Sequence, residues 1–213
     1  MKILGVSTLA IPDIKVIRFL RFRDHRGYFT EHFRESDFRD HPQMPFMKDV
    51  RFYQCNESRS RAGTVRGLHF QWSPYMGKLI RTVSGHMVDM ILDIRKGSPS
   101  FGHIFAYDMP DDPDSETAEW IWVPPGFAHG NFFPSDTTIE YFCSGEYSPE
   151  CEAGISPFAA DLDWSLCDPG LKHRLDQTPP LMSEKDKNGH TLASWIENPH
   201  SGRFLYPEFN PES

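Results

Sequence analysis

The chain has 213 residues, of which 38% are hydrophobic and 14% aromatic, and it contains 18 prolines and 15 glycines. This length suits one domain with a sizeable core, and many Pro and Gly interruptions between short apolar runs favour β-structure rich in turns. The formal net charge of -8 argues against a general nucleic-acid binder, which needs a basic surface for the phosphate backbone.

The amino-terminal stretch from Met1 to Val6 lacks the long apolar core of a secretion signal. No run approaches the roughly 20 apolar residues of a membrane span. We therefore expect a cytoplasmic protein with no membrane partner. The cysteines form no CxxC pair, which predicts reduced thiols and argues against a zinc site.

The first predicted strand covers residues 14–22, with an imperfect alternation of apolar and polar residues. The chain then turns at residues 24–27 and resumes as an extended segment over residues 28–33. Residues 34–41 are charged and are predicted to form a helical turn that ends before Pro42, because the residue before a proline disfavours helix.

From residue 50 to residue 150 the pattern predicts strands almost throughout. Short strands spaced about 8–15 residues apart, with turn residues between them, are typical of a sandwich or jelly roll. The predicted strands cover residues 50–56, 65–71, 78–83, 87–94, 101–108, 118–123, 129–133 and 137–143.

The carboxyl-terminal part has a different character. Residues 161–168 follow no regular pattern, whereas Ser183 stands where a helix cap would be expected, just before Asp186. The Pro-rich segment 199–213 is predicted to be coil. The helical spacing of three apolar residues predicts packing on the sheet; they are Leu192, Trp195 and Ile196.

We expect one domain over residues 1–213. Its core would cover about residues 14–190, and a C-terminal extension would cover about residues 191–213. The sequence contains no internal repeat and no low-complexity tract.

His69 stands between two large apolar residues on the predicted strand 65–71. Neighbours on a strand face opposite ways, so Leu68 and Phe70 share the face that His69 does not. If this apolar pair packs against a second sheet, His69 points into a cavity. A histidine in this setting is more often a satisfied core residue, so both interpretations stay open at this point.

A metal site finds weak support around His69. Small β-barrels of the cupin type often hold a metal through a His-x-His pair followed by a Glu. Here position 71 is Gln71, and no second histidine stands two residues away. The other histidines are scattered along the chain, so the pattern does not favour a transition metal.

Acid–base chemistry fits the residues better. A histidine can exchange a proton near neutral pH, and Lys78 begins the next predicted strand, which a hairpin would bring alongside His69. Tyr141 shares a strand face with Ile139 and Cys143, a candidate interior face. Together with a carboxylate, such a lining would offer a base, a cation for a developing oxyanion and an acid.

Two carboxylates share one face of the predicted strand 87–94. Asp89 and Asp93 are candidates for the carboxylate of such a cavity, but either could simply pair with Arg81 or Arg95. Tyr141 could also have a purely structural role, because most buried tyrosines are structural and need only a partner for the hydroxyl.

A series of motifs runs along the chain from about residue 14 to about residue 190. The first reads D-x-R-G-x-F-x-E, and the third contains R-G-L-H-F-Q. The motifs are Asp24–Glu31, Gln54–Ser58, Arg66–Gln71, Gly77–Leu79, Asp93–Gly102, Pro125–Gly130, Tyr141–Cys143 and Tyr147–Glu150.

In this series the chain resembles the dTDP-4-dehydrorhamnose 3,5-epimerases and related nucleotide-sugar epimerases. The resemblance implies an all-β, cupin-like jelly roll with short peripheral helices. It implies a homodimer in which the amino-terminal strands contribute to the partner's site, and no metal or organic cofactor. The implied substrate is a nucleotide-linked 4-keto-6-deoxyhexose, as in deoxysugar and polysaccharide biosynthesis. Its ketone acidifies the protons on C3 and C5, because the carbanion delocalises onto the C4 oxygen.

The resemblance also implies a role for individual residues. His69 matches the base, and Asp186 matches the carboxylate that orients it. Lys78 matches the group that stabilises the enolate oxygen, and Tyr141 matches the acid that returns a proton from the opposite face. Arg66 matches a ligand of the diphosphate, for which a planar bidentate donor is suited.

Further binding positions carry over in the same way. Gln54 and Asn56 match ligand contacts, and Tyr147 matches an aromatic residue that stacks on the base or sugar. Asp89 and His129 match polar residues of the cavity. Three more residues match the arm that reaches the nucleotide; they are Arg26, Phe29 and Glu31.

The chain departs from the family pattern at a few positions. Asn131 stands where the family usually has the Phe of A-H-G-F, and Met76 replaces the common Gln before Gly77. These changes bear on substrate choice more than on reaction type. The alternatives are an epimerase of C3 only or C5 only, a ketoisomerase on a different nucleotide sugar, or a non-catalytic sugar-nucleotide-binding barrel.

The spacing of Arg66 and His69 raises a geometric requirement. They are three residues apart, so on a regular strand they face opposite ways. If both contact the substrate, the strand must bulge near Gly67.

Overall fold

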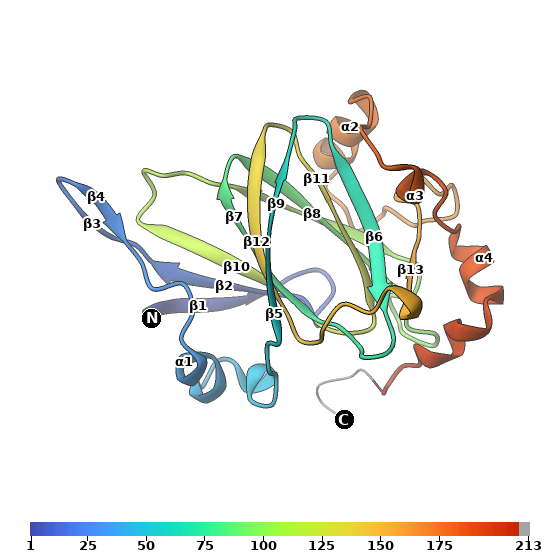
Figure 1. Cartoon of the computed structure of the whole chain (residues 1–213), viewed down its shortest axis with the longest axis horizontal. Helices are drawn as coiled ribbons and strands as arrows, with labels where there is room; N and C mark the ends of the chain where they lie inside the picture. The colour runs from blue at the N-terminus through green and yellow to red at the C-terminus, as the bar shows by residue number, and fades with distance from the viewer. Residues whose placement is uncertain (209–213) are drawn as a thin grey trace.

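Two antiparallel sheets form the centre of the computed structural model, which describes residues 1–208 (Figure 1). The six-stranded sheet runs in the order β1 (Ile3–Thr8), β2 (Lys15–Leu20), β10 (Thr117–Val123), β7 (Lys78–Ser84), β12 (Thr137–Cys143) and β5 (Gln54–Ser60). The five-stranded sheet runs in the order β13 (Glu152–Gly154), β6 (Val65–Gln71), β11 (Phe127–Phe132), β8 (His86–Asp93) and β9 (Ile104–Pro110). The chain passes back and forth between these sheets, as in a jelly roll.

Short elements surround the two sheets. A separate hairpin of β3 (Phe22–Asp24) and β4 (Gly27–Phe29) projects away from them (Figure 1). The helices are α1 (Glu35–Asp40), α2 (Pro169–Gln177), α3 (Glu184–Lys187) and α4 (Leu192–Glu197), with 3-10 turns η1 (Pro45–Met47), η2 (Pro149–Cys151) and η3 (Pro199–Arg203). No helix among residues 1–208 is long and apolar enough to cross a membrane.

The core has three parts. Side chains from both sheets meet in an inner cluster that includes Ile80, Ile91 and Ile139. A second cluster covers the outer face of the five-stranded sheet, and a third covers the outer face of the six-stranded sheet beneath α1 and η1. Because both outer faces carry peripheral segments, the sheets bury apolar side chains on both sides.

The apolar pair beside His69 packs differently from the expectation. Leu68 and Phe70 lie in the outer cluster, and the ring of Phe70 is 4.6 Å from that of Trp195 and 5.4 Å from that of Phe204. Their partner is therefore the C-terminal segment and not the second sheet. His69, on the opposite face of β6, still points between the sheets.

Several predicted boundaries were wrong for physical reasons. The strand predicted over residues 50–56 begins only at Gln54, because Val50 and Phe52 pack from a loop onto the outer face of the six-stranded sheet. The segment predicted as coil from residue 199 contains η3, whose first residue is a proline capped by Asn198. Ile196, predicted to pack on the sheet, is 38% exposed. Residues 209–213 of that predicted coil lie outside the described residues.

Besides the 3-10 turns η1 and η2, three elements escaped prediction altogether. The edge strand β1 is only half-buried, and β13 is three residues long. Helix α2 buries only Leu175, so its apolar periodicity is weak, although Asp168 caps it by accepting hydrogen bonds from Gly170 and Leu171. By contrast, β6 and β12 match their predicted ranges at both ends.

Replacing Trp195 with Ala should destabilise the protein by about 3–5 kcal/mol, because the indole fills the cluster behind β6 and a cavity would remain. The adjacent Ile196→Ala is the control, and should cost no more than about 1 kcal/mol because Ile196 is partly exposed. Denaturant unfolding measures both. Equal losses in the two variants would show that the C-terminal segment does not belong to the core.

Candidate active site

A bulge in β6 sets the geometry of the site. His129 of β11 pairs with His69, but Asn131 pairs with Arg66. Moving two residues along β11 therefore corresponds to moving three residues along β6, which means that β6 carries one extra residue. Gly67 lies within this bulge at a φ of 98°, and a Cβ there would come within 2.7 Å of the Gly130 Cα. The bulge turns Arg66 and His69 to the same side, where both line one cavity. The expected break in the strand is confirmed.

His69 is held by a carboxylate from the C-terminal region. Its Nε2 lies 2.6 Å from Oδ1 of Asp186, which belongs to α3. Ser183 caps α3 as predicted: its hydroxyl accepts a hydrogen bond from the Asp186 amide and donates one to Asp186 Oδ2 at 2.9 Å. This cap fixes the orientation of the carboxylate that holds the imidazole.

The charge state of Asp186 follows from its surroundings. Burial disfavours the carboxylate, but the hydrogen bond and charge of His69 and the hydrogen bond of Ser183 outweigh it, so the pKa of Asp186 is lowered. An ionised Asp186 accepts the proton of His69 Nε2, which leaves Nδ1 as the basic nitrogen. No other residue among 1–208 hydrogen-bonds to Nδ1.

Lys78 faces His69 from the opposite sheet. The expected hairpin between their strands is wrong, because residues 72–77 carry the chain from the five-stranded sheet to the six-stranded one. Burial lowers the pKa of Lys78, and the nearby Cys143 and Asp89 oppose this shift. Within residues 1–208 its ammonium group makes no hydrogen bond or ion pair, so it remains available to a ligand.

Tyr141 lies beside Lys78 on the same sheet. It pairs with Ile80 of β7 and Asn56 of β5, and its face is interior, as predicted. Burial raises the pKa of Tyr141, an effect that the nearby Arg66 and Asn56 side chains oppose. The phenol therefore carries its proton at neutral pH and can donate it.

Two adjoining cavities meet at these residues. The first, of about 370 Å³, extends towards Gln54, Tyr147 and Glu152. The second, of about 470 Å³, extends towards Arg66 and Asp186. Both are lined by the same four side chains, which are His69, Lys78, His129 and Tyr141.

A second histidine–carboxylate pair lies deeper in the fold. His129 Nε2 is 2.6 Å from Oδ1 of Asp89, and both side chains are buried. Burial lowers the pKa of His129, and the charge of Asp89 opposes this shift. Asp89 and Asp93, both predicted as candidate cavity carboxylates, line neither cavity. Asp93 pairs with Arg95 at 2.8 Å, so its structural interpretation holds.

The remaining predicted contacts of the first cavity form one network. Gln54 Nε2 donates to Asn56 Oδ1 at 3.0 Å, and Gln54 Oε1 accepts from the Tyr147 amide at 2.9 Å. The half-exposed Tyr147 donates its hydroxyl proton to Glu152. Glu152 and its partner Lys185 were not predicted from the sequence. Only the position of Lys185 next to Asp186 could have indicated them.

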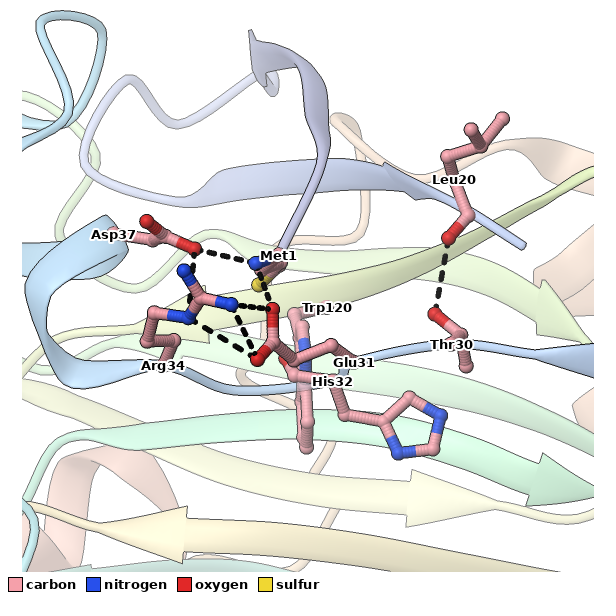
Figure 2. A network of polar contacts seen from close by, with 8 residues as sticks. All are labelled: Met1, Leu20, Thr30, Glu31, His32, Arg34, Asp37 and Trp120. Atoms are coloured by element: carbon pink, nitrogen blue, oxygen red, sulfur yellow. Dashed lines mark hydrogen bonds and ion pairs between the residues drawn. The ribbon is translucent and has the colours of Figure 1, made fainter. Parts of the chain in front are cut away.

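The three arm residues lie outside both cavities of this chain. Arg26 pairs with Asp24 at the tip of the projecting hairpin, and Phe29 is 69% exposed. Figure 2 shows Glu31 between the Met1 amine and the Arg34 guanidinium. The structure of one chain therefore does not bring these residues to His69.

Comparison with known proteins decides the family. The family described as dTDP-4-dehydrorhamnose 3,5-epimerase matches residues 8–194. This chain belongs to that family. The predicted family, the cupin-like jelly roll and the assignment as an isomerase of the nucleotide-sugar epimerase type are thereby confirmed.

Individual relatives support the assignment. The dTDP-4-dehydrorhamnose 3,5-epimerase of Sinorhizobium fredii is 39% identical over 191 residues, covering 88% of this chain and 89% of the relative. The chain spans about half (53%) of the Neisseria gonorrhoeae relative, at 35% identity over 89% of this chain.

Solved structures agree with these relatives. The Legionella pneumophila epimerase RmlC, in complex with dTDP-4-keto-L-rhamnose, is 30% identical with a TM-score of 0.74, covering 89% of this chain and 93% of that one. The 3'-monoepimerase ChmJ of Streptomyces bikiniensis, in complex with dTDP-quinovose, is 29% identical with a TM-score of 0.77, covering 97% and 96%.

Proposed function

We propose that this epimerase inverts C3 and/or C5 of a nucleotide-diphospho-4-keto-6-deoxyhexose without a cofactor. The observation that carries the proposal is the placement of His69 with Asp186 on one wall of a cavity and of Lys78 with Tyr141 on the other. A relative of this chain is described in complex with dTDP-4-keto-L-rhamnose, a sugar of this class.

The chemistry follows from this placement. His69 removes the proton from the carbon next to the C4 ketone, and ionised Asp186 stabilises the resulting imidazolium. The electron pair of the broken C–H bond moves to the C4 oxygen, where the cation of Lys78 stabilises the enolate. Tyr141 then returns a proton to the same carbon from the opposite wall. Because base and acid lie on opposing sheets, the carbon is inverted.

The rest of the ligand can be placed from the groups that remain free. The Arg66 Nε donates to Ser60 at 3.0 Å, which holds the guanidinium and leaves its terminal nitrogens for the diphosphate. The half-exposed ring of Tyr147, with Gln54 and Asn56 beside it, offers a stacking surface for the base or sugar. His129 completes the polar lining, and the buried Asp89 behind it lies outside both cavities and holds its imidazole.

Two further parts of the proposal concern the protein as a whole. We infer a homodimer in which the β3–β4 hairpin of each chain reaches the site of its partner, since Phe29 is exposed on a hairpin that projects from its own chain. A cytoplasmic location is supported by the cysteines, which are all free.

In D₂O, the protein should introduce deuterium at each inverted carbon of dTDP-4-keto-6-deoxyglucose, and the labelled positions distinguish C3 from C5 inversion. His69→Asn should lower this exchange by about 10²–10⁴-fold, because the base is lost, while dTDP binding persists. Mass spectrometry and NMR measure the label. The matched control is His86→Asn, which removes a histidine–carboxylate pair outside both cavities. Unchanged exchange in His69→Asn would exclude His69 as the base, and binding without exchange in the wild type would indicate a non-catalytic barrel.

Complementation tests the proposed dimer. Phe29→Ala and His69→Asn should each reduce activity, but mixed dimers regain one site with an intact histidine from one chain and an intact arm from the other. After denaturation and joint refolding, about half of the dimers are mixed, so about a quarter of the wild-type sites should work. Activity no higher than the mean of the separately refolded variants would contradict an arm that acts on the partner's site.

A further inference from the structure

Asn131 occupies the interior face of β11 where the family pattern has Phe. Its side chain is buried and lines the second cavity, two residues from His129 and opposite Arg66 in the strand pairing. A buried polar side chain at an aromatic position needs hydrogen-bond partners, because unpaired buried groups are costly.

The neighbours of Asn131 fix the orientation of its amide. Nδ2 lies 2.6 Å from Asp89 Oδ1 and 3.2 Å from the Met87 sulfur. An ionised carboxylate and a thioether can only accept hydrogen bonds, so the amide nitrogen must face them. The reverse orientation would place the amide oxygen against the Asp89 carboxylate, with no proton between them.

The amide oxygen of Asn131 is consequently turned away from Asp89. No donor reaches it among residues 1–208. The fully buried side-chain atoms that lack a hydrogen-bond partner include Asp89 Oδ2, but the Asn131 oxygen is not one of them. The oxygen therefore remains accessible, and the space that it adjoins is the second cavity.

We propose that Asn131 is a specificity-determining residue, whose amide oxygen accepts a hydrogen bond from the C2 hydroxyl of the sugar. This inference rests on the proposed function, which places the reacting carbon at His69 and the diphosphate at Arg66.

The position of Asn131 selects this hydroxyl. In the sugar, C2 lies between C1, which carries the diphosphate, and C3, next to the ketone. In the site, Asn131 pairs with Arg66 across the two strands. Two residues before it on the same strand, His129 pairs with His69. A phenylalanine at this position would offer no acceptor to a hydroxyl. A site built to hydrogen-bond a hydroxyl discriminates against a substrate that lacks it.

The test compares two substrates, dTDP-4-keto-6-deoxyglucose and its 2-deoxy analogue, by solvent deuterium exchange. Asn131→Leu keeps the branched shape of the side chain but removes the acceptor, and it should lower kcat/KM for the 2-hydroxy sugar by about 10-fold relative to the 2-deoxy sugar. The ratio between the substrates cancels any effect of the lost contact with Asp89. The matched control is Asn198→Leu in the cap of η3, outside both cavities, which should leave the ratio unchanged.

A second variant protects the test against misfolding. Asn131→Phe introduces the residue of the family pattern, and dTDP binding with a cooperative thermal transition verifies the fold of each variant. An unchanged substrate ratio in a folded variant, with both rates reduced or neither, would overturn the role of Asn131. No exchange by the wild type on either sugar would instead overturn the proposed function itself.

Discussion

A bulge in β6 at Gly67 is the constraint on which the site depends. Without it, the three-residue spacing would point Arg66 and His69 to opposite faces of the sheet. The close approach of Gly67 to Gly130 of the neighbouring strand leaves no room for a side chain at either position. The backbone thus places a phosphate-binding cation and a base in one cavity, and the surrounding elements orient them.

The electrostatics of the cavity divide between its two walls. On one wall, a buried carboxylate with a lowered pKa holds His69 in the tautomer that can accept a proton. On the other wall, Lys78 has no anionic partner within residues 1–208, and Tyr141 retains its proton. When a bound ketone is converted to the enolate, its oxygen would provide the negative charge that pairs with Lys78. The site is therefore organised for negative charge that develops during the reaction.

Sequence could predict much of this arrangement, for identifiable reasons. Strands such as β6 and β12 are bounded by turn residues at both ends, and the motifs around His69 indicated the chemistry. The position of Lys78 could not be predicted, because a short loop can form a hairpin or cross to another sheet. The orientation of Asn131 depends on Asp89, which is 42 residues away in sequence. Helix α2 escaped because it contributes a single buried side chain.

The central claim is that base and acid act from opposite walls, and Tyr141→Phe tests it most directly. In D₂O with dTDP-4-keto-6-deoxyglucose, the intact His69 should still exchange the substrate proton. The label should be returned mainly from the same face, so that NMR finds deuterium in the sugar with its configuration retained. Inversion at the wild-type rate in this variant would contradict the account.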